Sequence, residues 1–481
     1  MGLEIIILAA GKGTRMNSEL PKVLHKVAGQ AMLSHVIETA QQLSPDAIHV
    51  VVGHGSEQVK ETIQNDAVTW CLQEQQLGTG HAVQQALPNI KNDQQDVLIL
   101  YGDVPLLKTE TLQILINELS NKQLVLLSAI LEDPTGYGRI VRKGKNEIHA
   151  NATYSQGEVQ RNSNNQSNAA KSVQAIVEQK DADAEILTIK EINSGILAAQ
   201  AGNLKDWLTN VSNNNAQQEY YLTDCIELAV KNKQKVEAII CNDENEILGV
   251  NNKLHLAQVE RLLQSSIAEQ LMINGVTLTD PARIDVRGTL QTGQDVEIDV
   301  NSVFIGNNVL NDGVSVGANA VVINSIIEAG TTIHANCHIE NANIGKNCEL
   351  GPFARIRPET VLAENVKVGN FVEIKKANVK TGSKINHLSY IGDSDLGKNV
   401  NIGAGTITCN YDGANKHRTT IGDNVFVGSD TQFIAPVTIG DGATIGAGST
   451  ITKDSPEQKL TLTRSKQVSI DGWQRPQKKS N

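Results

Sequence analysis

The chain has 481 residues, a formal net charge of −11 and six cysteines, none of them in a CxxC pair. The length predicts two or more domains, and the acidic balance argues against a nucleic-acid or anionic-membrane partner, which normally requires a basic surface. The sparse cysteines indicate neither a zinc site nor a disulfide framework, and no stretch reaches the length of a membrane span, so we expect a soluble protein of the reducing cytoplasm.

The segment from Glu4 to Met16, EIIILAAGKGTRM, is a short apolar run followed by a glycine-containing turn. It predicts a buried strand and then a loop whose backbone N–H groups can approach phosphate oxygens. It is not a Walker A loop, because no G-K-[ST] follows at the required spacing, and Met16 stands where the dinucleotide fingerprint has its third glycine. Arg15 and Lys22 place two cations near the expected phosphates.

Further apolar runs at 48–53 and 96–107 alternate with helical stretches and predict a doubly wound, Rossmann-like α/β domain. Ligands of such domains bind at the carboxyl ends of the strands, and Asp103, in the YGDVP part of the second run, comes at such an end. A carboxylate beside anionic ligands there would hold Mg²⁺. An Asp-x-Pro sequence after a strand is more commonly a simple turn, so the position alone leaves both readings open.

Two further segments lie outside the predicted cores. The stretch 151–172 is rich in Asn, Ser and Gln and predicts a solvated or disordered loop. A linker helix over 254–274, ending at Gly275, is predicted by apolar residues near helical spacing, namely Leu256, Val259, Leu263, Ile267 and Leu271.

In the second half, apolar residues recur at every sixth position. The two runs are Ile344, Leu350, Ile356, Leu362, Val368, Ile374 and Ile421, Val427, Phe433, Ile439, Ile445, Ile451. Helices repeat at 3.6 residues and half-buried strands at 2, so neither explains this period. If each unit is one side of a triangular coil, the coils stack into a parallel β-helix. The alternative, a glycine-rich β-sandwich, would show alternation with a period of two.

Stacked coils make residues 18 apart vertical neighbours, separated by about 4.8 Å. Arg357 and Lys375 form such a pair, and two adjacent cations would bind an anion. Two solvated surface charges explain the spacing equally well. Arg355 over Glu373 predicts an ion pair between neighbouring coils.

Ser429 over Ala447 places small side chains in register, which leaves a groove for a thin, extended ligand. The six-residue pattern breaks near 385–393 and again at 408–420, a polar stretch that we expect to protrude as a loop. His387 lies beside the first break. A lone histidine in such a place is more often structural, so spacing alone assigns it no catalytic role.

These motifs resemble one family, the bifunctional N-acetylglucosamine-1-phosphate uridylyltransferase / glucosamine-1-phosphate N-acetyltransferase. The first half carries LAAGKGTRM, PKVL, LGTGHA and YGDVPL, and the second carries GPFARIRP, VGNFVEIKKA, HLSYIGD, VNIGAGTITCNYDG and VFVGSDTQF. The resemblance implies a uridylyltransferase domain at 1–253, a helical linker at 254–274 and an N-acetyltransferase domain at 275–481. It also implies that the β-helix is left-handed and that the protein is a homotrimer with acetyl-transfer sites between subunits. The polar stretch 151–172 is longer than the family's usual connection.

For the first half, the resemblance implies attack of the phosphate of N-acetylglucosamine 1-phosphate on the α-phosphorus of UTP, with Mg²⁺, Arg15 and Lys22 neutralising charge. Asp103 and Asn251 match the metal ligands. The residues that match the UTP site are Leu8, Ala9, Ala10, Gly11, Lys22, Gln73, Gly78, Thr79, Tyr101, Gly102 and Asp103. Those that match the UDP-sugar contacts are Gly138, Glu178, Asn193 and Asn251.

For the second half, the resemblance implies acetyl transfer from acetyl-CoA to glucosamine 1-phosphate, with His387 as general base. The acceptor site matches Arg357, Lys375, Tyr390 and Asn401. The acetyl-CoA site matches Ala404, Asn410, Tyr411, Ser429, Ala447 and Arg464. One alternative is a single-activity sugar-nucleotide pyrophosphorylase whose β-helix only oligomerises, and another is a scaffold without chemistry.

Overall fold

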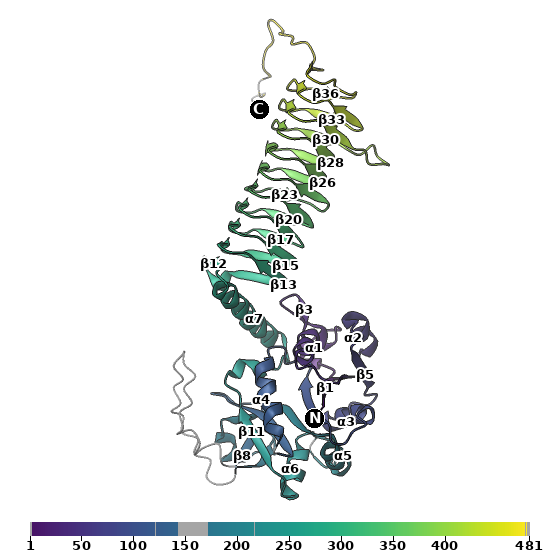
Figure 1. Cartoon of the computed structure of the whole chain (residues 1–481), viewed down its shortest axis with the longest axis vertical. Coiled ribbons are helices and arrows are strands. Elements are labelled where there is room, and N and C mark those ends of the chain that lie inside the picture. The colour runs from purple at the N-terminus through teal and green to yellow at the C-terminus, as the bar shows by residue number, and fades with distance from the viewer. Residues whose placement is uncertain (1, 121, 143–171, 216, 477, 479–481) are drawn as a thin grey trace. The chain divides into compact units, whose positions relative to one another are not determined.

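The computed structural model describes residues 2–120, 122–142, 172–215, 217–476 and 478, and the chain forms two compact units, 1–263 and 264–481 (Figure 1). The division falls inside helix α7, Lys253–Ile273, which occupies the range predicted for the linker helix. The polar stretch predicted as a loop at 151–172 lies, apart from its last residue, outside the described residues. Among the described helices, none combines the length and the apolar composition of a membrane span.

The first unit is built on a mixed sheet with strand order β11-β7-β10-β6-β1-β4-β5, in which β10 runs antiparallel to its neighbours β6 and β7. The strands are β1 (Leu3–Ala9), β4 (Ala47–Val52), β5 (Val68–Leu72), β6 (Asp96–Tyr101), β7 (Leu124–Ile130), β8 (Arg139–Arg142), β9 (Val173–Val177), β10 (Glu191–Gln200) and β11 (Val236–Ile240), and β2 (Lys26–Val27) pairs with β3 (Gln30–Ala31). The helices are α1 (Met32–Gln42), α2 (Ser56–Ile63), α3 (Thr79–Ala86), α4 (Thr109–Leu119), α5 (Ala201–Asn210) and α6 (Asp224–Lys231), with short 3₁₀ turns η1 (Thr14–Met16), η2 (Lys22–Leu24), η3 (Leu87–Asn89), η5 (Ile186–Thr188) and η6 (Glu244–Ile247).

Both faces of this sheet are covered by helices, as the continuous apolar runs predict. In β1, Ile5 and Ile7 belong to a core with residues of α1 and α4, whereas Ile6 and Leu8 belong to a second core with residues of α3, α5 and α6. A smaller cluster joins Val259 of α7 to Met16, Val27, Met32 and Val250. The Rossmann-like fold predicted for this half is confirmed.

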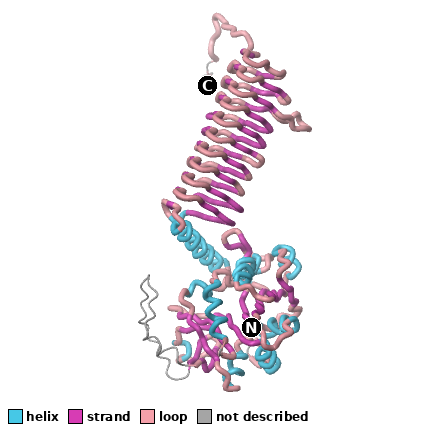
Figure 2. The backbone as a smooth tube through the Cα atoms, in the orientation of Figure 1, coloured by secondary structure: helices cyan, strands magenta, loops and turns pink. Residues whose placement is uncertain are grey.

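The second unit is a left-handed parallel β-helix, whose stacked strands are drawn in Figure 2. One sheet contains β12 (Thr277–Leu278), β14 (Glu297–Ile298), β16 (Ser315–Val316), β19 (Thr332–Ile333), β22 (Glu349–Leu350), β25 (Lys367–Asn370), β27 (Lys384–His387), β29 (Asn401–Ile402), β32 (Phe426–Val427), β35 (Thr444–Ile445) and β37 (Leu460–Thr461). The other contains β13 (Ile284–Thr292), β15 (Ser302–Leu310), β17 (Val321–Ile323), β18 (Ile326–Ile327), β20 (His338–Glu340), β21 (Ala342–Ile344), β23 (Arg355–Ile356), β24 (Thr360–Leu362), β26 (Glu373–Val379), β28 (Tyr390–Leu396), β30 (Ile407–Cys409), β31 (Thr419–Ile421), β33 (Gln432–Ile434), β34 (Val437–Ile439) and β36 (Thr450–Ile451). A 3₁₀ turn, η7 (Pro281–Arg283), precedes β13.

The apolar residues of both six-residue runs point into the core, and none of them exposes more than 2% of its surface. The coil length varies. Arg355 pairs with Glu373, as the uniform spacing requires, and Glu373 pairs with Tyr390, one position earlier, where the pattern was expected to break. His338 also pairs with Arg355 one position too early, outside the predicted break, and this corrects the uniform spacing that we expected elsewhere. The expected spacing therefore identifies vertical neighbours in some coils only.

The protruding loop is shorter than the predicted 408–420. Strands β30 and β31 take up its two ends, and Thr408 and Thr419 are fully buried. The loop proper is 410–418. Because it is inserted into one coil, Ile407 pairs with Gln432, which lies further along the chain than one ordinary coil would place its partner.

Candidate active sites

Four residues predicted for uridylyl transfer converge beyond the carboxyl end of β6. Nζ of Lys22 forms an ion pair with Asp103 and lies 2.9 Å from Oδ1 of Asn251. The Arg15 guanidinium donates to the same Oδ1 at 2.9 Å. The segments also meet through the backbone, because the N–H of Val250 donates to the carbonyl of Asp103 at 2.9 Å.

The glycine loop brings Lys22 to this point. Gly13 has φ +61, and a Cβ placed on it would lie 2.6 Å from the Cβ of Lys22. Only glycine fits both the left-handed backbone and this close approach. The N–H of Gly102 donates to the carbonyl of Leu8 at 3.0 Å, which sets the ends of β1 and β6, with Ala9 and Ala10 buried there, side by side.

The residues present fit a divalent cation. Asp103 offers a carboxylate and Asn251 offers an amide oxygen. Both contact the same positive group, the Lys22 ammonium. Across the described parts of the chain, no group of three or more His, Cys, Asp or Glu could hold a metal ion. Two oxygen ligands suit Mg²⁺, which commonly takes one or two protein ligands and completes its shell with water and substrate phosphates.

Three of the four residues predicted for the sugar, Gly138, Glu178 and Asn193, lie together around β8, β9 and β10, whereas Asn251 belongs to the cluster of Arg15 and Lys22. The N–H of Asn193 donates to the carbonyl of Gly138 at 2.9 Å, and a Cβ on Gly138 would lie 3.3 Å from Oε1 of Glu178. Burial raises the pKa of the Glu178 carboxyl above its ordinary value, although a hydrogen bond from Thr223 at 3.5 Å opposes this.

Tyr101 connects the sugar residues with the phosphate end of the site. Its pKa is raised by burial and by the nearby charges of Asp103 and Glu178, so the phenol stays neutral. Its ring packs over Gly195, where a Cβ would come within 2.7 Å of the ring. Tyr101 therefore lies close to Asp103, which is matched to the metal, and to Glu178, which is matched to the sugar.

Gln73, matched to the base of UTP, is buried with 3% exposure. Its Nε2 donates to the carbonyl of Gly78 at 3.1 Å and lies 3.1 Å from Nδ1 of His81. Since a carbonyl oxygen only accepts, the nitrogen of the amide faces Gly78 and its oxygen faces the other way. Thr79 accepts from the N–H of Leu222 at 3.0 Å. His81 also lines a cavity of about 320 Å³ with Leu72, Glu74, Gln75 and Gln85.

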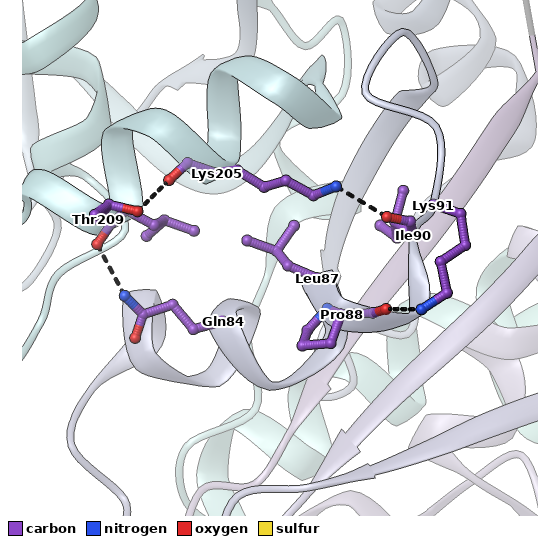
Figure 3. A pocket seen from close by; sticks show the side chains of 8 residues that line it. Gln84, Leu87, Pro88, Ile90, Lys91, Lys205 and Thr209 are labelled. Atoms are coloured by element: carbon purple, nitrogen blue, oxygen red, sulfur yellow. Dashed lines mark hydrogen bonds between the residues drawn. The ribbon is translucent and has the colours of Figure 1, made fainter.

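A second cavity, of about 380 Å³, lies between the end of α3, η3 and α5 (Figure 3). Its walls are Gln84, Leu87, Pro88, Ile90, Lys91, Lys205, Leu208 and Thr209. Lys205 donates to the carbonyl of Ile90 at 2.9 Å, and Lys91 to that of Pro88 at 2.6 Å, as Figure 3 shows. No residue predicted for catalysis or binding lines it.

In the second unit, Arg357 and Lys375 occupy equivalent positions in neighbouring coils, each directly after a core isoleucine. The predicted ion pair of Arg355 with Glu373 is present at 3.8 Å, but Arg357 makes the shorter contact with this carboxylate, at 2.6 Å. Glu373 therefore lies between both arginines and compensates part of the charge that we expected to be free.

Lys416, on the loop 410–418, is a cation that the sequence reasoning missed. Its proximity to Lys375 lowers the pKa of the Lys375 ammonium, with smaller contributions from burial and from Arg357. Three cations thus face one region. The signal available in the sequence was the polar loop itself, which was singled out without assigning a role to its lysine. Tyr390 lies beside this cluster, since its ring leaves no room for a Cβ at Gly392, the coil neighbour of Lys375.

His387 stands in a different ladder. Strand pairing places Asn370, His387, Ala404, Ser429 and Ala447 one above the other, each two positions after a core residue. The small side chains predicted as a groove wall therefore lead directly to the imidazole. Nδ1 of His387 lies 3.2 Å from Oδ1 of Asn370, so the ring can carry its proton on Nδ1 and present the lone pair of Nε2.

Hydrogen bonds fix the loop 410–418, both within the loop and to β28. Asn410 is buried and donates to Asp393, Tyr411 donates to the carbonyl of Gly413 at 2.6 Å, and His417 contacts Asp412 at 2.6 Å. Asp412 also accepts two backbone N–H groups, and these bonds hold the pKa of its carboxyl below the ordinary value.

Two further predicted residues, Asn401 and Arg464, lie on the same unit. Asn401 is in β29, and Arg464 is exposed, with its side chain beside Gly448 next to Ala447. Among the described residues of the chain, no hydrogen bond or ion pair joins His387 directly to Arg357, Lys375 or Lys416.

Comparisons with known proteins match both units. The family model described as MobA-like NTP transferase domain matches residues 5–143, the GMPPB C-terminal domain matches 286–387, and the bacterial transferase hexapeptide (six repeats) matches 418–453. The solved structure of UDP-glucose pyrophosphorylase complexed with UDP-glucose is a distant neighbour, with a TM-score of 0.42 and 13% identity over 55% of this chain and 100% of that chain.

Curated relatives match over nearly the whole length. The bifunctional protein GlmU of Marinobacter nauticus is 53% identical over 99% of both chains, and that of Cupriavidus pinatubonensis is 52% identical over 99% of this chain and 100% of its own. GlmU of Stutzerimonas stutzeri is 51% identical over 100% of both chains. With half of its residues identical over this length, the chain belongs to the GlmU family of bifunctional uridylyltransferase and acetyltransferase enzymes.

Proposed function

We propose that the two activities of this bifunctional enzyme occupy separate sites, uridylyl transfer within 1–253 and acetyl transfer within 275–481, with 254–274 as the linker. Acetyl transfer to glucosamine 1-phosphate comes first, and its product is the substrate of uridylyl transfer, which yields UDP-N-acetylglucosamine and pyrophosphate. The observation that carries this assignment is that each unit gathers its own set of reactive groups: Lys22 on two oxygen ligands, and His387 at the end of a ladder of small residues.

In uridylyl transfer, the nucleophile is a phosphate oxygen of N-acetylglucosamine 1-phosphate, which is already anionic and needs no general base. It attacks the α-phosphorus of UTP, and the bond to pyrophosphate breaks. The task of the site is to bring two polyanions together. Arg15 and Lys22 neutralise phosphate charge. Asp103 and Asn251 hold Mg²⁺, which supplies further charge neutralisation when bound.

Recognition of the base and sugar uses polar groups with fixed orientation. The outward amide oxygen of Gln73 accepts from the N3–H of uracil, because its nitrogen is committed to Gly78. Glu178 and Asn193 bind sugar hydroxyls beside Gly138, where a Cβ would lie 3.3 Å from Oε1 of Glu178. Tyr101 closes the site between sugar and phosphates as a neutral phenol.

In acetyl transfer, Nε2 of His387 takes a proton from the ammonium group of glucosamine 1-phosphate, and the free amine attacks the carbonyl carbon of acetyl-CoA. The C–S bond breaks, and the leaving thiolate is protonated to the thiol by the proton that the nitrogen loses as the amide forms. Arg357, Lys375 and Lys416 bind the sugar phosphate, with Tyr390 and Asn401 on the acceptor side. The pantetheine arm of acetyl-CoA follows the ladder of Ala404, Ser429 and Ala447, whose small side chains leave space for it. Asn410, Tyr411 and Arg464 contact acetyl-CoA at the edge of this groove.

We also propose that the protein is a cytoplasmic homotrimer. The cations and His387 stand on separate ladders of one chain, so a neighbouring copy is a natural source of the remaining contacts. An exposed apolar column beside His387 supports this: Phe353 and Phe371 stack with ring centroids 5.3 Å apart, and Leu388 is 63% exposed. Exposed apolar patches commonly mark protein interfaces. Analytical ultracentrifugation of the purified protein tests it, and a monomer would exclude it.

The decisive experiment is the substitution His387→Ala. Thiol release from acetyl-CoA with glucosamine 1-phosphate is expected to fall by about 10² to 10⁴ in rate, whereas pyrophosphate release from UTP persists. Retained acetyl transfer would remove His387 from its role. Absence of acetyl transfer from the unmodified protein would instead favour the single-activity pyrophosphorylase, and absence of both products the scaffold.

A further inference from the structure

Two segments of the first unit present the oxygen ligands proposed for the metal. One leaves β6, carries Asp103 and reaches Lys108, the residue before α4. The other passes through η6, which contains Glu246, and reaches Asn251 shortly before α7. The separation of the two ligands depends on how these segments are fixed to each other.

The segments are joined at two levels. Near the ligands, the N–H of Val250 donates to the carbonyl of Asp103 at 2.9 Å. At the far end, the N–H of Lys108 donates to Oε2 of Glu246 at 3.2 Å, and Nζ of Lys108 lies 3.4 Å from Oε1 of the same carboxylate. Asp243, which caps η6, adds a contact of 3.2 Å to Nζ.

The far link is costly to break because Glu246 is withdrawn from water. Its side chain is 5% exposed, whereas Lys108 is 53% exposed. A buried carboxylate that loses its cationic partner is strongly disfavoured, more so than an exposed ion pair that separates. Burial by itself would lower the pKa of the Lys108 ammonium, but the carboxylates of Asp243 and Glu246 raise it above the ordinary value, so Lys108 stays charged.

We infer that Lys108 and Glu246 are positioning residues for the metal site, because their ion pair fixes the segment of Asp103 against the segment of Asn251. Neither residue reaches the reacting phosphates; they act through the two ligands. This inference rests on the proposed function, since it assumes that Asp103 and Asn251 bind the metal. Residues that orient metal ligands typically change metal affinity about 10- to 100-fold when they are replaced.

The test uses the full-length protein and Mn²⁺ as a spectroscopic substitute, with bound Mn²⁺ measured by electron paramagnetic resonance in the presence of UDP-N-acetylglucosamine. Lys108→Met and Glu246→Gln are each expected to weaken Mn²⁺ binding about tenfold. The double variant should be no weaker than either single variant, because the pair acts as one unit. Lys108→Arg, which keeps the charge, should recover binding to within about threefold.

A matched control is Lys122→Met. Lys122 also contacts two carboxylates, Glu118 at 2.6 Å and Glu237 at 2.5 Å, but belongs to neither ligand segment. It should leave Mn²⁺ binding unchanged. Far-UV circular dichroism and the thermal unfolding of the first unit report whether each variant is folded, because thiol release at the acetyl-transfer site depends on residues of the other unit.

Unchanged Mn²⁺ affinity in folded Lys108→Met and Glu246→Gln would overturn the inference, as would additive losses in the double variant. An equal loss in Lys122→Met would show a general effect of removing ion pairs and would also overturn it. If the unmodified protein binds no Mn²⁺, the proposed metal site itself fails, which is a different result from a metal site that is insensitive to this pair.

Discussion

The two proposed sites are assembled in opposite ways. In the α/β unit, residues separated by more than two hundred positions meet through direct side-chain contacts, as Arg15 and Asn251 do at 2.9 Å. In the β-helix, residues become neighbours because strand pairing stacks them, and His387 shares a ladder with Ala404 without a side-chain bond between them. The first site is therefore held by specific contacts within one chain. The second depends on register, and its parts remain separate in one chain.

We expect the largest effect from a substitution in the α/β unit, whose proposed site is held together by side-chain contacts. Lys22→Ala removes the group that contacts both Asp103 and Asn251, so two polyanions must react with less neutralisation. Uridylyl transfer, measured as pyrophosphate release from UTP, should lose about 10² to 10³ in kcat/KM. Acetyl transfer by the same preparation should be unchanged, and a parallel loss there would show that the variant is misfolded.

In the proposed site of the β-helix, Lys416→Ala removes one of the three cations that would hold the sugar phosphate. Charge-assisted bonds of this kind contribute about 1.5 to 3 kcal/mol. We expect KM for glucosamine 1-phosphate to rise about 10- to 100-fold in the thiol-release assay, with a smaller change in kcat. Lys398→Ala, another exposed lysine of the same unit, should leave KM unchanged. A normal KM in Lys416→Ala would exclude the loop from the acceptor site.

The groove is tested by Ser429→Leu, which places a branched side chain in the ladder between Ala404 and Ala447. Overfilling a fitted space typically costs about 1 to 3 kcal/mol, so KM for acetyl-CoA should rise about tenfold while KM for the sugar phosphate stays constant. Thr438→Leu is the control, because Thr438 is exposed on a strand outside this ladder. Equal behaviour of both variants would mean that acetyl-CoA does not follow the ladder.

The same contrast explains what could be predicted from the sequence. The six-residue pattern identifies the β-helix because each side of a coil places one apolar residue in the core. The glycine loop and the apolar runs identify the α/β sheet. The motifs also point to Arg15, Lys22, Asp103 and Asn251, which the structure brings together.

Register was harder to predict. A uniform coil length pairs Arg357 with Lys375, but it fails at His387, because the strand partner of His387 is Asn370, one position nearer in the chain than that length requires. The ladder from His387 through Ala404 to Ser429 could not be counted either, since the loop 410–418 is inserted between the last two. Spacing also cannot show which ion pairs form. The contact of Arg357 with Glu373 depends on the directions of the side chains, which a sequence period does not determine.

The smallest expected effect concerns the pH dependence of phosphate binding beside Lys375. Lys416 lowers the pKa of Lys375, and Arg357 acts in the same direction, whereas Asp393 opposes them. A lysine with a depressed pKa loses its charge earlier as the pH rises, so binding of a phosphate at this cluster should weaken at a lower pH than for an ordinary lysine. N-acetylglucosamine 1-phosphate is the suitable probe, because it carries the phosphate but no free amine, and saturating UDP-N-acetylglucosamine keeps it out of the uridylyl-transfer site. In Lys416→Ala the pKa of Lys375 should move back up, so the alkaline fall in affinity, measured by calorimetry, should shift to higher pH even though binding is weaker throughout. If both proteins lose affinity at the same pH, the two lysines do not face one phosphate.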